Sequence, residues 1–230
     1  MYNMKSEAFK GKNALIIGGT SSIGLKVASL LYQNGCNVTV AGRHKPQECQ
    51  EDIYNVLLFD FDTEGFTIFE RDDFKQAISQ CDILINCYGP FIQKPLHETS
   101  VKEWQLISNS NYAFAGALAS CCLKSMMNRN WGRIILFGGT RTESVKGFKS
   151  NACYAGAKTG IAVLVKSISQ EYEAYGIKCH GIFPGFTRNA PSNTTIIQPE
   201  VIADKIVYLL EQDELNGVLL NIDRGWVPVL

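Results

Sequence analysis

The sequence predicts an α/β protein in which a parallel β-sheet is covered by helices on both faces. Short, almost continuously apolar runs alternate with longer stretches whose apolar residues recur at helical spacing. Continuous apolar runs are typical of strands buried on both faces of a parallel sheet. Their alternation with helices implies βαβ units and a doubly wound sheet. The expected strands lie at 13–19, 37–42, 55–60, 82–89, 133–139, 178–185 and 217–223, and the clearest helical patterns at 22–35, 74–80, 101–130, 154–176 and 199–212.

The chain as a whole predicts one domain over residues 1–230. Its 230 residues are 46% hydrophobic, which is enough to bury a core, and no Pro/Gly/Ser-rich linker or repeat divides them. The formal net charge is zero, so no global field attracts nucleic acid or an anionic membrane. No run reaches the length of a membrane span. We therefore expect neither nucleic-acid nor membrane partners.

The cysteines and histidines predict no metal centre. None of the eight cysteines is spaced as C-x-x-C, and the three histidines show no ligand spacing with them. Cys36, Cys81, Cys87 and Cys179 lie in apolar runs, as buried thiols do. This cysteine usage favours a reducing, cytoplasmic location.

The first candidate binding element is the stretch "IIGGTSSIG", residues 16–24, which follows the first strand and opens the first helix. Its glycines allow the backbone to approach a pyrophosphate at the helix N-terminus. A Walker A loop needs lysine directly after the last glycine, but Leu25 stands there and Lys26 is one place late. The spacing also differs from G-x-G-x-x-G, so a tight turn without a ligand is an alternative. The candidate residues of this loop are Gly18, Thr20, Ser21, Ser22, Ile23 and Gly24.

The end of the second strand indicates which nucleotide would bind. NAD-binding proteins usually place an acidic residue there, on the ribose 2′-hydroxyl. This chain has "VAGRHK", with Arg43 and no acid nearby. An arginine suits a 2′-phosphate, so the sequence favours NADP(H) over NAD(H). A solvated loop arginine is the alternative.

Tyr154 and Lys158 form the candidate chemical pair. They stand at i and i+4, on one face of a predicted helix. A tyrosine normally titrates near 10, and a cation one turn away lowers that pKa. The tyrosine can then exchange a proton with an alcohol or ketone oxygen. Such a pair also arises by chance, but this one begins the helix after the fifth strand, at the sheet edge where ligands bind.

In this order, the glycine loop, Arg43 and Tyr154-x-x-x-Lys158 resemble the classical short-chain dehydrogenase/reductase (SDR) family, in particular its 3-oxoacyl-[acyl-carrier-protein] reductase-like members. The resemblance runs from about Lys12 to Gly225. It implies a single Rossmann-type domain with a doubly wound, seven-stranded parallel sheet flanked by helices.

Further motifs extend the resemblance. "LLFDFD" is similar to the end of the third strand in the family, where an aspartate contacts adenine. "INCYG" is similar to the Asn-Asn-Ala-Gly motif of the family. "GIFPGFT" matches the Pro-Gly motif that lines the nicotinamide, and "WQLISNSNYAFAG" places the catalytic asparagine of the family on Asn111. The residues that the resemblance assigns to the cofactor are Asp60, Phe61, Asn86, Gly89, Pro184, Gly185, Phe186 and Thr187, beside Tyr154 and Lys158.

The resemblance implies an NADP-dependent reduction of a ketone or 3-oxoacyl-type carbonyl to a secondary alcohol, or the reverse. NADPH delivers hydride to the carbonyl carbon and Tyr154 protonates the oxygen. Lys158 holds the nicotinamide ribose and lowers the tyrosine pKa, and Asn111 anchors a water that relays protons.

One departure concerns the serine that normally polarises the carbonyl. Aligning "GRIILFGG" to the family pattern places Gly139 at the serine position, whereas counting thirteen residues back from Tyr154 gives Arg141. Thr140 is the nearest hydroxyl. Either Thr140 substitutes for the serine, or the donor is missing, which typically costs about 10²–10³ in rate. The alternative functions are therefore a catalytically weakened, NADP-binding sensor or scaffold, and a synthase or epimerase on the same fold.

The expected partners are a small-molecule carbonyl or alcohol and further copies of the chain. The resemblance implies a homodimer or homotetramer formed by helices 101–130 and 154–176, and ordinary packing on the sheet is the alternative. The apolar residues on these helices are Phe114, Leu118, Cys121, Ile161, Leu164 and Ile168.

Overall fold

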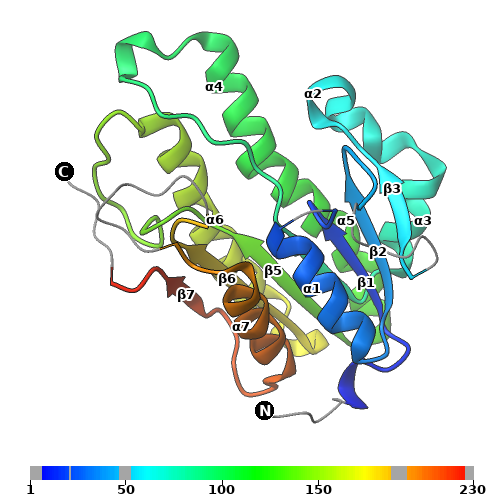
Figure 1. Ribbon diagram of the computed structural model, residues 1–230. Helices are drawn as coiled ribbons and strands as arrows, with labels where there is room; N and C mark the ends of the chain where they lie inside the picture. The colour runs from blue at the N-terminus through cyan, green and yellow to red at the C-terminus, as the bar shows by residue number, and fades with distance from the viewer. Residues whose placement is uncertain (1–6, 21, 47–52, 188–195, 226–230) are drawn as a thin grey trace.

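The computed structural model describes residues 7–20, 22–46, 53–187 and 196–225, and the strands within them form one sheet (Figure 1). The strands are β1 (Asn13–Ile17), β2 (Asn37–Gly42), β3 (Asn55–Leu58), β4 (Ile83–Asn86), β5 (Gly132–Phe137), β6 (Ile177–Pro184) and β7 (Leu219–Ile222). The helices are α1 (Ser22–Gln33), α2 (Phe61–Glu64), α3 (Asp72–Gln80), α4 (Val101–Ser108), α5 (Phe114–Arg129), α6 (Ala152–Glu171) and α7 (Pro199–Glu211).

The sheet has the order β3-β2-β1-β4-β5-β6-β7, and every neighbouring pair is parallel. β1 pairs with β2 from Asn13 opposite Asn37, and with β4 on its other side. The chain therefore reverses its winding direction between β1 and β4. The predicted doubly wound, seven-stranded parallel sheet is confirmed, and a crevice is expected at the carboxyl ends of β1 and β4.

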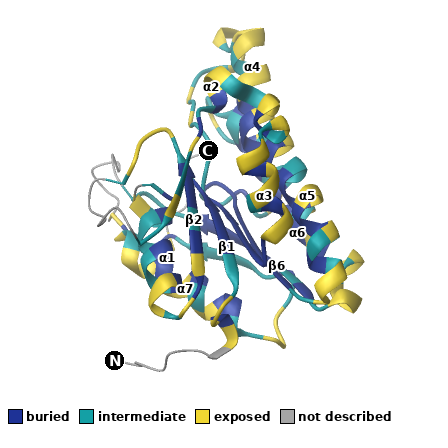
Figure 2. Ribbon diagram, turned by 90° about the vertical axis from the view of Figure 1, so that its right-hand side faces the viewer, coloured by how far each residue is buried: buried dark blue, intermediate teal, exposed yellow. Residues whose placement is uncertain are grey.

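Helices cover both faces of the sheet, as the apolar strand runs predict. α1 and α7 pack side by side on one face, where Ile16 and Ile206 are buried (Figure 1). α3, α5 and α6 cover the other face, where Leu15 and Ile161 are buried. Consecutive residues of a strand point to opposite faces, so a continuous apolar run serves both layers. Figure 2 shows the buried strands between helices whose outer faces are exposed.

Several predicted strands end earlier in the structure than in the sequence. The run 82–89 forms a strand only over Ile83–Asn86, and the run 133–139 forms one over Gly132–Phe137. The remaining residues of both runs are loops at the carboxyl edge. Apolar content alone does not separate a buried strand from the buried loop that follows it.

The predicted helix 101–130 is divided into α4 and α5 by a π-helical turn, Asn109–Ala113. The apolar pattern runs through the turn without a break, so sequence periodicity does not reveal it. π-Turns inside helices occur frequently at functional sites. This one carries Asn111.

The apolar helix residues considered for an oligomer interface largely pack within the chain. Phe114, Leu118, Ile161 and Ile168 are buried in the core, whereas Cys121 is exposed. Packing on the sheet therefore accounts for these four, and the homo-oligomer stays a prediction. In the ranges described above, no helix is long and apolar enough to cross a membrane.

Candidate active site

An open cavity of about 830 Å³ lies at the carboxyl edge of the sheet, where the crevice is expected. Its walls come from the segments after β1, β2, β3, β4, β5 and β6 and from the first turns of α1 and α6. The predicted site residues that line it are Gly18, Thr20, Ser22, Ile23, Gly24, Arg43, Gly89, Tyr154, Lys158, Pro184 and Thr187.

The glycine loop after β1 is packed too closely for side chains. Gly18 has a φ of 76°, and a Cβ there would lie 3.2 Å from the backbone nitrogen of Tyr88. A Cβ on Gly24 would lie 2.3 Å from the Gly18 carbonyl oxygen. The loop therefore exposes backbone beside the start of α1, as a phosphate-binding turn requires. Ser21, which was predicted to bind here, lies outside the described residues.

The last residue of β2, Gly42, has no room for a side chain. A Cβ on Gly42 would lie 2.3 Å from the Thr20 hydroxyl oxygen, so only glycine fits. The next residues, Arg43, His44 and Lys45, are exposed and line the cavity. This edge of the cavity is therefore cationic.

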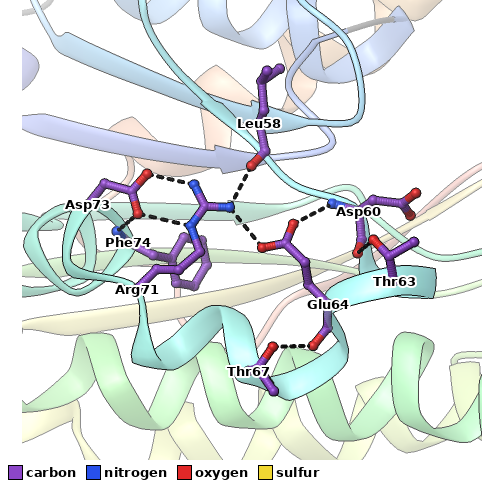
Figure 3. A network of polar contacts seen from close by, with 8 residues as sticks. All are labelled: Leu58, Asp60, Thr63, Glu64, Thr67, Arg71, Asp73 and Phe74. Atoms are coloured by element: carbon purple, nitrogen blue, oxygen red, sulfur yellow. Dashed lines mark hydrogen bonds and ion pairs between the residues drawn. The ribbon is translucent and has the colours of Figure 1, made fainter.

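The segment after β3 departs from the expected adenine contacts. Asp60 caps α2, because its Oδ1 accepts from the backbone nitrogen of Asp62 at 3.1 Å, and its own backbone nitrogen donates to Glu64 Oε1 at 3.1 Å. Glu64 is itself fixed by Arg71, whose Nη1 donates to Glu64 Oε2 at 2.8 Å (Figure 3). Asp62, rather than Asp60, lines the cavity.

Phe61 also lies behind the cavity wall. It is buried in a group of aromatic rings, 5.1 Å from Phe114 and 6.0 Å from Tyr88 between ring centroids. Tyr88 replaces the alanine of the family motif and does line the cavity. The Asn86 side chain holds this turn, since its Oδ1 accepts from the backbone nitrogen of Tyr88 at 3.2 Å.

Tyr154 and Lys158 lie in the first turns of α6 and both line the cavity, as predicted from their spacing. Lys158 Nζ donates to the Phe137 carbonyl oxygen at 2.8 Å and lies 5.9 Å from the centroid of the Tyr154 ring. Burial lowers the pKa of Lys158 to about 8 and raises the pKa of Tyr154 to about 12. The predicted lowering of the tyrosine pKa by the lysine is not found, because burial of the phenol dominates.

The buried ammonium of Lys158 predicts a pH-dependent stability. Its pKa is about 8 in the folded chain against an ordinary 10.5. Between these values the unfolded chain binds more protons, so this group makes the unfolding free energy rise with pH, by roughly 3 kcal/mol in all. In Lys158→Met this contribution is expected to vanish. Denaturant unfolding of both proteins at several pH values between about 7 and 10 measures it.

The informative quantity is the difference between the two proteins. Buried thiols such as Cys36, whose pKa burial raises to about 12, make both proteins less stable as the pH rises above 9. Lys124→Met, at an exposed position on α5, is a control that should retain the slope of the parent. An equal slope in Lys158→Met and the parent would contradict a buried, charged Lys158.

Asn111 is held by the π-turn so that one of its atoms stays available. Its Nδ2 donates to the carbonyl oxygens of Ile107 at 3.1 Å and Pro90 at 3.0 Å. Its Oδ1 is buried, and no protein donor of the described chain satisfies it. A Cβ on Gly89 would lie 2.2 Å from this oxygen and 2.9 Å from Lys158 Nζ. Asn111 and Lys158 thus converge on one point, although Asn111 does not itself line the cavity.

The turn after β5 settles which residue stands beside the tyrosine. A Cβ on Gly139 would lie 3.0 Å from Tyr154 Cε1, so Gly139 lies directly against the tyrosine ring. The Thr140 hydroxyl donates to the Pro184 carbonyl oxygen at 2.8 Å. The Thr142 hydroxyl donates to the Gly139 carbonyl oxygen at 3.0 Å. The Thr140 hydroxyl therefore links the turn after β5 to the end of β6, which disfavours its predicted role as the donor to the substrate carbonyl.

Phe91 is a site residue that the sequence does not signal. Its ring is perpendicular to that of Tyr154, with centroids 4.9 Å apart, and 61% of the residue is exposed. It presents apolar surface beside the tyrosine at the mouth of the cavity. Its position depends on the turn after β4, which no local pattern predicts.

Some predicted residues lie near the cavity without lining it, and some lining residues were missed. The first group is Asp60, Phe61, Asn86, Asn111, Thr140, Gly185 and Phe186. The second group is Leu25, Lys26, Gly42, His44, Lys45, Phe59, Asp62, Cys87, Tyr88, Pro90, Phe91, Phe137 and Gly138. The signal for His44 and Lys45 was the cationic run "GRHK". In the described part of the chain, no three His, Cys, Asp or Glu side chains gather as a metal site would require.

Comparison with known proteins assigns the family. The family model of short chain dehydrogenases matches residues 12–200, and the chain therefore belongs to the short-chain dehydrogenase family, whose members are oxidoreductases that use nicotinamide cofactors. An uncharacterized oxidoreductase of Staphylococcus aureus is 27% identical over 218 residues, which are 87% of this chain and 91% of the relative. The 2-dehydro-3-deoxy-D-gluconate 5-dehydrogenase of Formosa agariphila is 25% identical over 94% of this chain and 92% of that protein.

Solved structures support the same fold. A candidate 3-oxoacyl-reductase of Bacillus thuringiensis superposes with a TM-score of 0.82 at 24% identity, covering 96% of this chain and all of that one (100%). A short chain dehydrogenase/reductase family protein superposes with a TM-score of 0.79 at 24% identity, covering 96% of this chain and 98% of that one.

Proposed function

We propose that this protein is an NADP(H)-dependent oxidoreductase that reduces a ketone or 3-oxoacyl-type carbonyl to a secondary alcohol, or catalyses the reverse. The observation that carries the proposal is the position of Tyr154 and Lys158. Both line a cavity that begins at the glycine loop after β1 and ends at the exit of β6. A proton donor and a cation thus share one cavity with a phosphate-binding turn.

The residues present fit a dinucleotide. The glycine loop and the N-terminus of α1 would hold the pyrophosphate, and Arg43 with its cationic neighbours would hold the 2′-phosphate. Lys158 would hold the nicotinamide ribose, beside the unsatisfied Oδ1 of Asn111. When bound, the cofactor supplies or accepts the hydride.

The protein's own groups handle the proton. With a pKa of about 12, Tyr154 carries its proton at neutral pH, so its hydroxyl can donate to a carbonyl oxygen that gains charge. This protonation state is the one that reduction of a carbonyl requires. The Lys158 ammonium, with a pKa of about 8, remains mostly charged at pH 7, so it can donate to the nicotinamide ribose that it would hold. Asn111 Oδ1 can accept from a water that resupplies the proton.

A ketone panel tests the activity. Loss of NADPH absorbance would be followed with a small aliphatic ketone, an aryl ketone, a 3-oxoacyl thioester and a keto-sugar acid. The last two follow the named activities of a structural neighbour and of a relative. Turnover of at least one substrate is expected, and binding of NADPH without turnover of any would reject a reductase of these carbonyls.

Arg43→Ala tests the choice of nucleotide. Loss of an exposed, charge-assisted contact with the 2′-phosphate is expected to weaken NADPH binding by about tenfold, while NADH binding is unchanged. Dissociation constants from NADPH fluorescence measure the effect, with Lys124→Ala as a control at an exposed position outside the cavity. NADH binding as tightly as NADPH, with neither affinity changed by Arg43→Ala, would refute the NADP preference.

A second candidate function is an NADP-binding sensor or scaffold with weakened chemistry. The observation that favours it is the turn after β5, where Thr140 and Thr142 both donate to backbone carbonyls and Gly139 carries no hydroxyl. Such a protein would bind NADPH with ordinary affinity and turn over no ketone of the panel. A gain of turnover on restoring a serine at position 139 would instead favour the enzyme.

A further inference from the structure

The turn after β5, residues 139–142, holds an arginine in a conformation that favours glycine. We call it the Gly139 turn. The Thr142 backbone nitrogen donates to the Gly139 carbonyl oxygen at 3.1 Å, which closes the turn. Arg141 stands within it with a φ of 58°. A side chain in this left-handed region costs conformational energy, so it persists only where surrounding contacts determine it.

The side chain of Arg141 forms an ion pair with a buried carboxylate. Arg141 Nη2 donates to Asp223 Oδ1 at 3.0 Å, and Arg141 Nε contacts Asp223 Oδ2. The Asp223 side chain is 4% exposed, and its Oδ1 also accepts from the Gly225 backbone nitrogen at 2.9 Å, so Arg141 stabilises its charge together with this amide. The guanidinium thus makes one hydrogen bond, to Oδ1, and an ionic contact with Oδ2, which has no hydrogen-bond partner among the described residues. Contacts with both carboxylate oxygens fix the direction of the side chain as well as its distance.

Asp223 in turn packs on the exit of β6, which we define as residues 184–187. A Cβ on Gly185 would lie 3.0 Å from Asp223 Cα, and the Gly185 backbone nitrogen donates to the Ile222 carbonyl oxygen at 2.8 Å. The Thr140 hydroxyl adds a second link, to the Pro184 carbonyl oxygen at 2.8 Å. Two successive residues of the Gly139 turn are therefore fastened to the β6 exit.

The first residue of the same turn lies against the tyrosine. The position of a Cβ on Gly139 is 3.0 Å from Tyr154 Cε1 and 3.4 Å from Lys158 Cβ. The first residue of the Gly139 turn thus contacts Tyr154, the candidate proton donor. The next residues of the turn contact the β6 exit, which forms part of the cavity wall. The length and shape of the turn set the spacing between the two.

We propose that Arg141, anchored on Asp223, is a positioning residue that holds the Gly139 turn and so sets the distance between Tyr154 and the β6 exit. This inference rests on the proposed function, with the β6 exit beside the nicotinamide as the family resemblance implies. Arg141 has no contact with the reacting atoms in this scheme. It acts through the turn.

The test compares Arg141→Met with the parent in two ways. Misplacement of the β6 exit is expected to lower kcat by about 10²-fold. It is also expected to weaken NADPH while 2′,5′-ADP, which lacks the nicotinamide half, binds as in the parent. Both affinities are measured by titration calorimetry at a temperature at which the parent and the variant are folded. If NADH proves the tighter cofactor, NADH replaces NADPH and ADP replaces 2′,5′-ADP.

Arg129→Met is the matched control. Arg129 Nε donates to Asp82 Oδ1 at 2.7 Å, and that carboxylate is also nearly buried, but the pair lies next to the amino end of β4. This variant removes a comparable ion pair and should lower the melting temperature while leaving kcat and both affinities unchanged. If Arg141→Met behaves like Arg129→Met, or weakens both ligands equally, Arg141 serves stability alone and the inference is wrong.

Two further variants keep the test decisive. Arg141→Lys retains a cation near Asp223 without the two-point contact, and a smaller loss in the same quantities is expected. Arg141→Gly removes the backbone strain together with the anchor, so parental values in this variant would overturn the inference. If the parent reduces no ketone, the proposed activity fails, and the comparison of NADPH with 2′,5′-ADP still decides the role of Arg141.

Discussion

Replacement of Tyr154 by phenylalanine is expected to lower turnover on the order of 10²–10⁴-fold, the usual contribution of a positioned general acid. The change removes only the hydroxyl, so the ring contact with Phe91 and the packing beside Gly139 remain. NADPH should therefore bind nearly as in the parent. Steady-state rates with the best ketone of the panel, together with NADPH titration, measure the two effects separately.

Tyr175→Phe is the control for this prediction. Tyr175 follows α6 at its far end and does not line the cavity, so loss of its hydroxyl should leave the rate unchanged. Full turnover in Tyr154→Phe would place the proton transfer elsewhere. If NADPH binding is lost together with turnover, the variant damages the cavity and the loss of rate cannot be assigned to the hydroxyl.

Restoring a serine at position 139 is expected to raise turnover, and to do so most when one of the two crowded contacts of its Cβ is relieved. A Cβ at Gly139 would lie 3.0 Å from Tyr154 Cε1 and 3.3 Å from the Thr142 Cγ2 methyl, so Gly139→Ser alone is crowded. Thr142→Ser removes that methyl and keeps the hydroxyl that accepts from the Gly139 backbone nitrogen. The double variant is expected to gain up to about 10²–10³ in kcat, the usual contribution of one carbonyl donor.

Thr142→Ser alone is the control for the double variant and should match the parent. The thermal stability of the three variants shows whether crowding at position 139 is relieved. A double variant that folds, binds NADPH and gains no turnover would mean that the site lacks no donor. In that case the substrate oxygen is polarised by some other group, or the protein is not a carbonyl reductase.

The sequence anticipated the site best where the chemistry lies within one element. Tyr154 and Lys158 are one helical turn apart, so their common face follows from periodicity alone. The glycines of residues 16–24 follow a strand and open a helix, and their close approach in the structure has the same local origin. The lowered tyrosine pKa was not found, because it depends on burial by residues from other loops.

The loops at the carboxyl edge were anticipated less well. Asp60 was expected to face adenine, but it caps α2, and Asp62 lines the cavity. Phe91 gave no signal, although its ring lies on Tyr154. Contacts of this kind join segments tens of residues apart, and their geometry depends on where each strand ends rather than on the local pattern.

The sequence by itself determined the class of fold, the order of the binding elements and the candidate pair on α6. These follow from short-range periodicity and from residue types whose chemistry needs no partner to be recognised. Only the tertiary structure decided three contacts: Gly139 lies beside Tyr154, the Thr140 hydroxyl donates to the Pro184 carbonyl oxygen, and Arg141 forms an ion pair with Asp223. The physical reason is that parallel strands bring distant loops to one edge, where side-chain partners are set by strand register and by the length of each turn.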